Sequence, residues 1–354
     1  MGRHNSTETK KRKRRRRIFW FAIFPLLLVA AVSASYGTYL YKKAENMMGG
    51  AFFDDRGKSD LRDKKVDPHI DNVSILFIGI DESEKRGFSD NARSDALMLA
   101  TLNEKEKSVK LLTIPRDSYV YIKEVGYSTK INHAHKYGGP RATIETVEEL
   151  LDIPVDYYVR LDFEAFMAVV DALDGIDVDV PYAFSEQNSK DKAGAISLEA
   201  GMQKLDGEEA LALARTRKLD NDIERGKRQQ EIMKAIAAKA ASGASITKYG
   251  KVIDAIGDNM RTDMTFDEIK AFVDYAVSGN LSIESYTLEG EDTRIMNSQG
   301  QNIYYWQINE DSLADVKGKL KEHLDIATYD NTEMAKPTGQ EQEQEQDETL
   351  EQAP

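Results

Sequence analysis

Acidic and arginine side chains lie at the ends of three short apolar runs between residues 73 and 114. They are Asp81, Arg93, Asp95, Arg116 and Asp117. Carboxylate oxygens are ligands that Mg²⁺ accepts, and the planar guanidinium group of arginine binds two phosphate oxygens at once. If these side chains converge, they form a site for a divalent cation and a phosphate. The alternative is a set of surface ion pairs, which exposed loops commonly carry.

A second arginine pair, Arg215 and Arg217, lies further along the chain, just before a long helix predicted from about 222 to 241. Positions three or four residues apart share one face of that helix. Ile232 and Ile236 lie on the face that includes position 222 and direct it toward the core. The start of this helix is therefore also expected to point inward.

Polar residues continue the inward-facing stripe toward the start of the helix. Arg225 and Gln229 lie on it, with Gln230 beside it. Burying such groups costs free energy unless they have partners, and a pocket that holds a phosphate would supply them. Lys227 and Arg228 are expected to point elsewhere, toward solvent. A solvated first turn of the helix is the alternative interpretation.

Three apolar runs have to position the first charged set. Residues 73–80 form a continuous apolar run, typical of a strand buried on both faces. Further strands are predicted at 96–102 and 109–114, and the polar turn at 103–107 joins them as a hairpin. If the second strand also runs antiparallel to the first, the charged ends meet at one edge of the sheet. Ligands usually bind α/β sheets at the carboxyl ends of strands.

Strands and helices alternate through the rest of the domain. This pattern predicts an α/β fold, a layered α-β-α domain with a central mixed sheet. One transmembrane helix, predicted from the N-terminal region, precedes the domain. Further strands are expected at 157–161 and 176–180, and helices at 141–151, 163–173, 207–214, 246–256 and 266–277.

The composition excludes several classes of protein. The chain has 354 residues and a net charge of −13, and residues 1–17 carry nine basic side chains against one acidic one. The remainder is therefore strongly acidic, which argues against a nucleic-acid partner. The absence of cysteine excludes disulfides, thiolate catalysis and cysteine-ligated zinc. His133 and His135 are two residues apart and would not share a helix face, so we expect no metal pair there.

The N-terminal region predicts a membrane anchor. Eight basic residues at 10–17 precede an uncharged stretch at 18–41, which as a helix extends about 36 Å and can cross a hydrocarbon core of about 30 Å. Basic residues stay on the cytoplasmic side, so residues 1–17 form a cytoplasmic tail and the domain lies outside the cell membrane. A signal peptide cleaved after Ala34 is the alternative.

Three segments follow the predicted anchor. Residues 42–70 are polar and mixed in charge, which indicates a stalk. Residues 71–330 form the extracellular domain. Residues 331–354 are rich in Glu and Gln and have almost no apolar side chains to bury, so a disordered tail is expected.

Seven ordered sequence blocks resemble the LytR-CpsA-Psr family of Gram-positive bacteria, and the resemblance covers roughly residues 72–242. The blocks are GID at 79–81, RSDALML at 93–99, LTIPRDSYV at 112–120, KIN followed by GG within 130–139, LDGIDVDVP at 173–181, LDGEEALALARTR at 205–217 and RGKRQQ at 225–230.

The resemblance implies a phosphotransferase. Family members transfer wall teichoic acid, capsule or another secondary wall polymer from a polyprenyl-pyrophosphate carrier to peptidoglycan at the outer leaflet. The resemblance further implies that Asp81 and Asp95 hold Mg²⁺ or Mn²⁺. It assigns catalytic roles to Arg93, Asp95 and Arg116, and substrate binding to Arg215, Arg217, Arg225, Gln229 and Gln230.

Helix faces around 143–172 and 232–240 would line a groove for the lipid tail. Two alternatives remain open at this point. A lipid-pyrophosphate phosphatase could use the same site, because water can replace the sugar hydroxyl. A membrane-bound regulator of envelope genes would need a cytoplasmic element that reads DNA, and only about 17 residues precede the span.

Overall fold

The computed structural model describes residues 56–81, 92–242, 259–277, 281–297 and 299–326, together with Thr38, Lys42 and Phe52. Within this part, no helix has the length and apolar character that crossing a bilayer requires. The cytoplasmic tail, the span apart from Thr38, the helix expected at 246–256 and the C-terminal tail lie outside the described residues.

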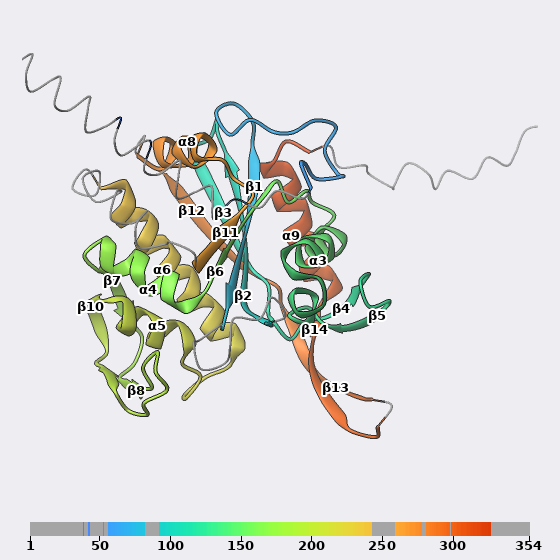
Figure 1. The fold of residues 1–354 in the computed structure, drawn as a ribbon. Coiled ribbons are helices and arrows are strands. Elements are labelled where there is room, and N and C mark those ends of the chain that lie inside the picture. The colour runs from blue at the N-terminus through green and yellow to red at the C-terminus, as the bar shows by residue number, and fades with distance from the viewer. Residues whose placement is uncertain are drawn as a thin grey trace, which may run out of the picture.

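A mixed sheet forms the centre of the domain (Figure 1). The first strand is antiparallel to the second, and the second is antiparallel to the third, which confirms the predicted hairpin. In spatial order the strands are β11 (Met260–Thr262), β6 (Tyr157–Leu161), β1 (Val73–Ile80), β2 (Ser94–Asn103), β3 (Ser108–Thr113) and β12 (Ser282–Thr287). The flanking pairs β1–β6 and β3–β12 are parallel.

Two helices cover one face of the sheet, α3 (His133–Leu151) and α9 (Glu310–His323) (Figure 1). Their apolar side chains pack on Leu76, Ile78 and Leu99 in the largest described core cluster. Helix α3 begins earlier than the sequence predicts because a first turn precedes a kink at Gly138 and Gly139. The straight part then starts near Pro140, where the fixed φ of proline suits a first helical turn.

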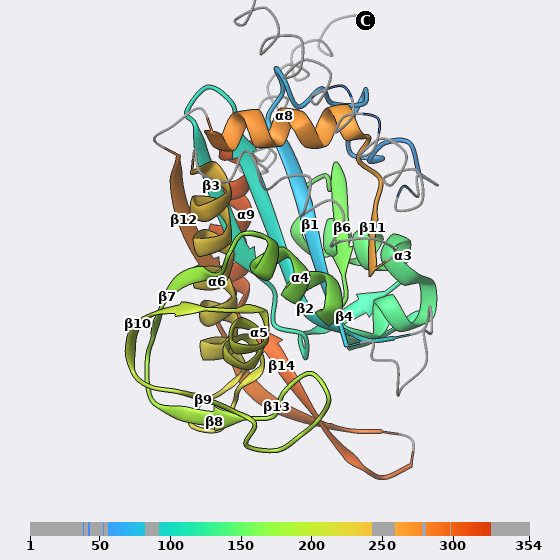
Figure 2. The same cartoon turned by 60° about the vertical axis from the view of Figure 1, so that its left-hand side comes forward.

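The other face of the sheet carries the helices α4 (Phe163–Ala172), α5 (Gly207–Arg215), α6 (Asp222–Ala241) and α8 (Phe266–Val277). Figure 2 shows α8 across one end of the sheet, and α4, α5 and α6 further along the same face. Helices α4, α5 and α6 share a second core with two small sheets. These sheets pair β7 (Ile176–Val180) with β10 (Gly201–Leu205), and β8 (Phe184–Glu186) with β9 (Ile196–Leu198).

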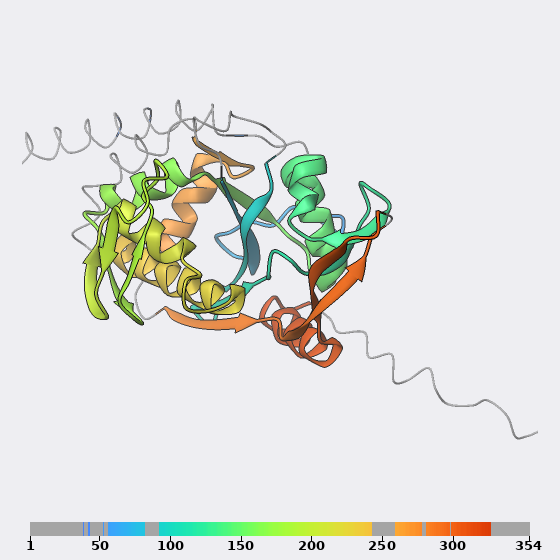
Figure 3. The same ribbon diagram turned by 90° about the horizontal axis from the view of Figure 1, so that it is seen from below.

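Two more hairpins lie beside α3 and α9. One pairs β4 (Tyr119–Ile122) with β5 (Tyr127–Lys130), and the other pairs β13 (Gly290–Met296) with β14 (Asn302–Ile308). The second hairpin extends away from the body of the domain and passes next to the first (Figures 1 and 3). A bridge between Ser118 and Trp306 joins them.

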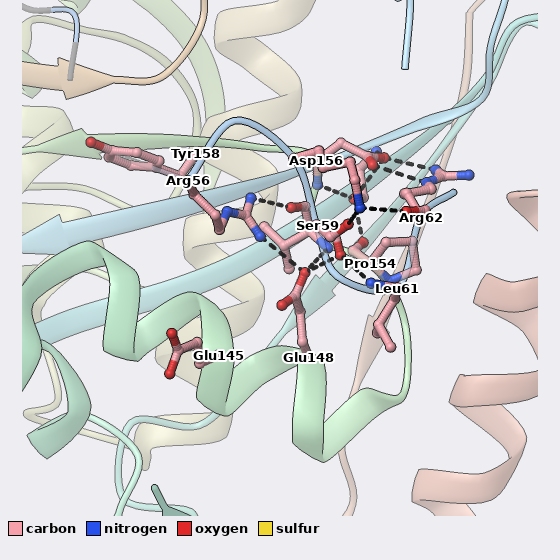
Figure 4. Close-up of polar contacts among 12 residues, drawn as sticks. Arg56, Ser59, Leu61, Arg62, Glu145, Glu148, Pro154, Asp156 and Tyr158 are labelled. Carbon is pink, nitrogen blue, oxygen red and sulfur yellow. Dashed lines mark hydrogen bonds and ion pairs between the residues drawn. The ribbon is translucent and has the colours of Figure 1, made fainter. Parts of the chain in front are cut away.

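Part of the predicted stalk is bound to the domain. Arg62 forms two hydrogen bonds of 2.8 and 2.9 Å with the buried carboxylate of Asp156, and Arg56 lies 3.1 Å from Glu148 (Figure 4). Ser59 also donates to Glu148, at 2.6 Å. We call residues 56–72 the strap, because these contacts fasten it across the starts of β1 and β6.

Candidate functional site

The predicted charged and apolar residues meet in one pocket between the central sheet and helices α4, α5 and α6. Its volume is about 550 Å³. Its walls are largely apolar at one end and charged at the other. The apolar lining includes Phe77, Met98, Leu161, Phe166, Ile232 and Ile236. Such walls can exclude water from a hydrocarbon chain, which makes burial of that chain favourable.

Seven of the predicted site residues line this same pocket. They come from the ends of β1 and β3, the start of β2, the end of α5 and the first turns of α6, as the proposed strand directions require. They are Asp81, Asp95, Arg116, Arg215, Arg217, Arg225 and Gln229. We call their end of the pocket the mouth.

A β-bulge turns Asp95 into the mouth. Just after Gly79, one residue of β1 faces two of β2, and Asp95 is the extra residue. Strict alternation would place Asp95 on the same face as Leu97, away from the pocket. The bulge redirects it toward Asp81. Gly79 permits the close approach of the strands, because a Cβ there would lie only 3.1 Å from the Cβ of Ala96.

Carboxylates surround the guanidinium group of Arg116. Its Nη1 lies 2.5 Å from Oδ1 of Asp95, and its Nε lies 3.8 Å from Oδ2 of Asp117. Burial alone would lower the pKa of Arg116, but the charges of Asp95, Asp222 and Asp117 raise it above its ordinary value. The carboxylates therefore stabilise a cation that the pocket would otherwise exclude.

Arg225 lies deeper and is only 7% exposed. Its Nη1 is 3.2 Å from Oδ1 of Asp222, and the same oxygen is 3.4 Å from Nη1 of Arg217. Burial lowers the pKa of Arg225, and the positive charges of Arg116 and Arg217 lower it further. One carboxylate thus serves two guanidinium groups, and among the predicted residues that line the pocket four are arginines and two are aspartates.

Two buried donors in the mouth lack hydrogen-bond partners within the described part of the chain. They are Nε of Arg116 and Nε of Arg225. A buried donor without an acceptor costs about 1–3 kcal/mol. An anion in the mouth would supply acceptors for both.

The remaining predicted residues of the mouth are fixed by local contacts. The guanidinium carbon of Arg215 lies 4.8 Å from the ring centre of Phe163, a cation–π contact that directs the side chain along α4. Gln229 donates to the backbone carbonyl of Ala214 at 3.1 Å, which ties α6 to the end of α5.

Three predicted residues do not line the pocket. Arg93 is exposed and near enough to His133 to lower its pKa. Asp117 is buried beside Lys130, 2.8 Å from its Nζ. Gln230 donates to the backbone carbonyls of Leu111 and Tyr286, because its position on α6 faces β3 and β12. Gln230 therefore joins the helix to the sheet.

Two further sequence expectations are wrong in the structure. The lipid groove was expected to include α3, but Ile144, Val147 and Leu151 pack on the opposite face of the sheet. A helix is present where it was predicted, but periodicity does not say against which face of the sheet a helix packs. Arg228 was expected to point to solvent, and it is only 6% exposed.

Arg228 holds the segment that carries the arginine pair. Its guanidinium group forms an ion pair with Asp220 and donates to the carbonyl of Thr216, and its Nε donates to the carbonyl of Leu213 at 3.3 Å. Asp220 also accepts from Tyr182 at 2.6 Å. These bonds, chiefly those from Arg228, keep the pKa of Asp220 below its ordinary value although burial raises it.

The mouth offers two carboxylates to a metal ion, Asp81 and Asp95. No cluster of three or more acidic, histidine or cysteine side chains that could hold a metal occurs among the described residues. Two carboxylates suit Mg²⁺, which usually takes one or two from the protein and completes its shell with water and substrate phosphate oxygens. Asp95 already contacts Arg116, so a metal there would share this carboxylate with the arginine.

Comparison with known proteins places the chain in a family. The model of the LytR_cpsA_psr family matches residues 38–322. The chain belongs to the LytR-CpsA-Psr family.

Members of this family with high similarity include two transferases. The polyisoprenyl-teichoic acid–peptidoglycan teichoic acid transferase TagT of Bacillus subtilis is 40% identical over 90% of this chain and 99% of its own. The transferase of the same kind named TagU, from Halalkalibacterium halodurans, is 41% identical over 82% and 93%. A structure of the LytR-CPS2A-psr family protein YwtF (TagT) with bound octaprenyl pyrophosphate lipid has a TM-score of 0.60 and 37% identity, covering 78% of this chain and 99% of that one.

The bonds of Arg228 lead to a prediction about stability. Arg228→Met should reduce the free energy of unfolding by about 3–5 kcal/mol, because it leaves Asp220 without its buried partner. The neighbouring Lys227→Met should change it by less than about 0.5 kcal/mol, since the partner of Lys227 within the described residues is Glu224, and this pair lies at the surface. Urea unfolding of both variants measures the difference, and equal stabilities would contradict the role assigned to Arg228.

Proposed function

We propose that this protein is a phosphotransferase that attaches a glycopolymer, such as wall teichoic acid, to peptidoglycan, taking it from a polyprenyl-pyrophosphate carrier. The observation that carries the proposal is the single pocket whose apolar walls lead to a cationic mouth. A polyprenyl pyrophosphate has the same division into a hydrocarbon chain and an anionic head. The names of the similar transferases and the lipid in the YwtF structure support this reading.

The mouth would hold the pyrophosphate through its arginines. Arg116 and Arg225 each have a buried Nε with no acceptor among the described residues, and the more exposed Arg217 lies beside them on Asp222. Positive charge fixed before the reaction stabilises the negative charge that develops on the phosphate oxygens, without reorganisation in the transition state. The guanidinium groups of the mouth would thus lower the free energy of the transition state.

The proposed reaction is a displacement at the phosphorus atom that carries the glycan. A hydroxyl oxygen of a peptidoglycan sugar forms a new bond to this phosphorus, and the bond from the phosphorus to the bridging oxygen of the pyrophosphate breaks. Polyprenyl phosphate leaves with the bridging oxygen, and a carboxylate of the mouth takes up the hydroxyl proton. Water in place of the sugar hydroxyl would give hydrolysis, which the test below distinguishes.

We also propose that Asp81 and Asp95 hold Mg²⁺ or Mn²⁺ beside the pyrophosphate. The bound ion would supply additional positive charge to the phosphate oxygens. The bulge at Asp95 supports this assignment, since it brings a second carboxylate to the same mouth as Asp81.

The membrane anchor remains part of the proposal on the strength of the sequence. Residues 10–17 and 18–41 have the charge and length of a cytoplasmic flank and a span. This topology would place the pocket on the outer side of the cell membrane. Protease added to wall-stripped cells with an intact membrane should then remove the domain. Survival of the domain in those cells would refute this topology.

The arginine cluster leads to a prediction about the donor. In Arg217→Ala, transfer should fall about 100- to 1,000-fold, since loss of one donor to developing oxyanion charge has that effect. The melting temperature without ligand should stay unchanged or rise, because Arg217 repels the buried Arg225. The stabilisation that polyprenyl pyrophosphate gives should be lost. Arg217→Lys should not restore activity, because an ammonium group lacks the planar fork.

The measurement uses the full-length chain in detergent with a lipid-linked glycan and a peptidoglycan oligomer, followed by mass spectrometry of the product. Arg141→Ala is the matched control, since Arg141 lies exposed on α3, where it pairs with Glu145, and does not line the pocket. Release of free glycan phosphate without ligation would show a hydrolase. Normal transfer by Arg217→Ala would contradict the proposed mouth.

The metal proposal has its own prediction. Asp81→Asn should lower transfer by about 100-fold or more and should leave the melting temperature within about 2 °C, because the change keeps the side-chain size. Mn²⁺ binding to the wild type, followed by electron paramagnetic resonance, should tighten when pyrophosphate is added and weaken in the variant. Asp315→Asn on α9 is the control. Full activity in chelator would contradict a metal role.

A further inference from the structure

An aromatic surface lies next to the mouth and takes no part in holding the proposed donor. Its first part joins the hairpins β4–β5 and β13–β14. The rings of Tyr119 and Tyr305 meet edge to face with centres 4.8 Å apart. Nζ of Lys130 lies 5.5 Å from the ring centre of Tyr304 and 5.9 Å from that of Tyr305. Figure 3 shows the two hairpins side by side.

The second part comes from β5 and the first turn of α3. Tyr127 and Tyr137 are 52% and 43% exposed. The neighbouring Tyr137 raises the pKa of the Tyr127 hydroxyl, with smaller contributions from burial and from Tyr305. His133 contacts Tyr137 edge to face, with ring centres 6.1 Å apart. The kink at Gly138 and Gly139 ends this turn, so its direction is independent of the rest of α3.

Direct contacts connect this surface to the mouth. Lys130 pairs with Asp117 at 2.8 Å, and Asp117 lies 3.8 Å from Arg116, which lines the pocket. The backbone of Asp117 also accepts a hydrogen bond of 2.9 Å from the amide of Trp306 in β14. Through Asp117, these contacts place Lys130, at the edge of the tyrosines, near the guanidinium group of Arg116 in the mouth.

Packing of the core does not explain these tyrosines. Tyr157 and Tyr275, for comparison, are at most 9% exposed and donate to backbone carbonyls inside the domain. Tyr127 and Tyr137 instead keep about half of their surface in water, where a large aromatic side chain gains little from folding. Clustered exposed aromatic groups are a mark of binding surfaces.

The charges around the aromatic surface favour an anionic or neutral polar partner. Lys130 and Lys136 lie against its rings, and Arg93 is near His133. Two of the carboxylates there are engaged: Asp117 binds Lys130, and Asp292 accepts from the hydroxyl of Tyr304 at 2.8 Å. A third, Glu124, lies exposed beside the kink at Gly138. This basic region contrasts with the net charge of −13 of the whole chain.

We infer that the aromatic surface of Tyr119, Tyr127, Tyr137, Tyr304 and Tyr305, with Lys130, binds the acceptor glycan strand and delivers its hydroxyl to the mouth. This inference rests on the proposed function, since only a transferase needs an acceptor site. The C–H faces of pyranose rings stack on aromatic rings, and tyrosine hydroxyls bond to sugar hydroxyl and acetamido groups. The lysines suit the carboxylates of the peptide stems.

The test compares Tyr127→Ala, Tyr137→Ala and the double variant in the full-length protein. The KM for a peptidoglycan oligomer should rise about 3- to 10-fold for each ring removed, with little change in the KM for the lipid-linked donor. Tyr127→Phe should retain most of the acceptor affinity, because it keeps the stacking ring. Met202→Ala, which truncates an exposed apolar side chain on the distant strand β10, should have no effect.

Binding of the oligomer without donor, measured by isothermal titration calorimetry, separates this inference from the proposed function. If the wild type transfers and the tyrosine variants keep their acceptor KM, the inference is overturned and the function stands. If the wild type hydrolyses the donor and does not bind the oligomer, both are overturned. Weakened oligomer binding in the double variant, with unchanged thermal stabilisation by polyprenyl pyrophosphate, supports the inference.

Discussion

The crowding of four guanidinium groups around one pocket mouth is the constraint on which the site depends. Arg116 and Arg225 are largely buried, and the positive charges of Arg116 and Arg217 disfavour the charged form of Arg225. Asp95 and Asp222 make this arrangement possible, since each carboxylate lies within 3.4 Å of a guanidinium nitrogen. The compensation is incomplete for Arg116 and Arg225, whose Nε atoms are buried without a hydrogen-bond partner among the described residues, and the proposed anion would complete it.

The secondary structure around the mouth follows from this constraint. The strands β1, β2 and β3 must run in alternate directions so that their charged ends meet, and the N-terminal turn of α6 must lie against β3. Gly226 allows that contact, because a Cβ at this position would lie 2.8 Å from Cγ2 of Thr113. Gln230 then joins the helix to two strands through backbone carbonyls. The helix is thus fixed on the sheet one turn from Arg225.

Sequence reasoning reached the convergence of the charged residues because the relevant patterns are local. The apolar run of β1 and the short polar turn before β3 fix the strand directions, and the 3.6-residue period of α6 identifies Arg225 and Gln229 as inward-facing.

The role of Arg228 was missed, since its partners Leu213 and Thr216 are backbone carbonyls that carry no sequence signal. The bulge at Asp95 was missed for a similar reason, because register irregularities depend on the partner strand. The strands β12 to β14 were missed because they are half exposed and mix polar with aromatic residues.

The strap determines how the domain would carry mechanical load. Tension applied to the chain ahead of residue 56 reaches Arg56, Ser59 and Arg62 before it reaches β1. Asp156, the partner of Arg62, also accepts from the amide of Ser74, so the load is shared with the start of β6. Force on the N-terminal end of the chain would therefore act first on the charged contacts of Arg56 and Arg62, and through Asp156 on the first residues of β1 and β6 together.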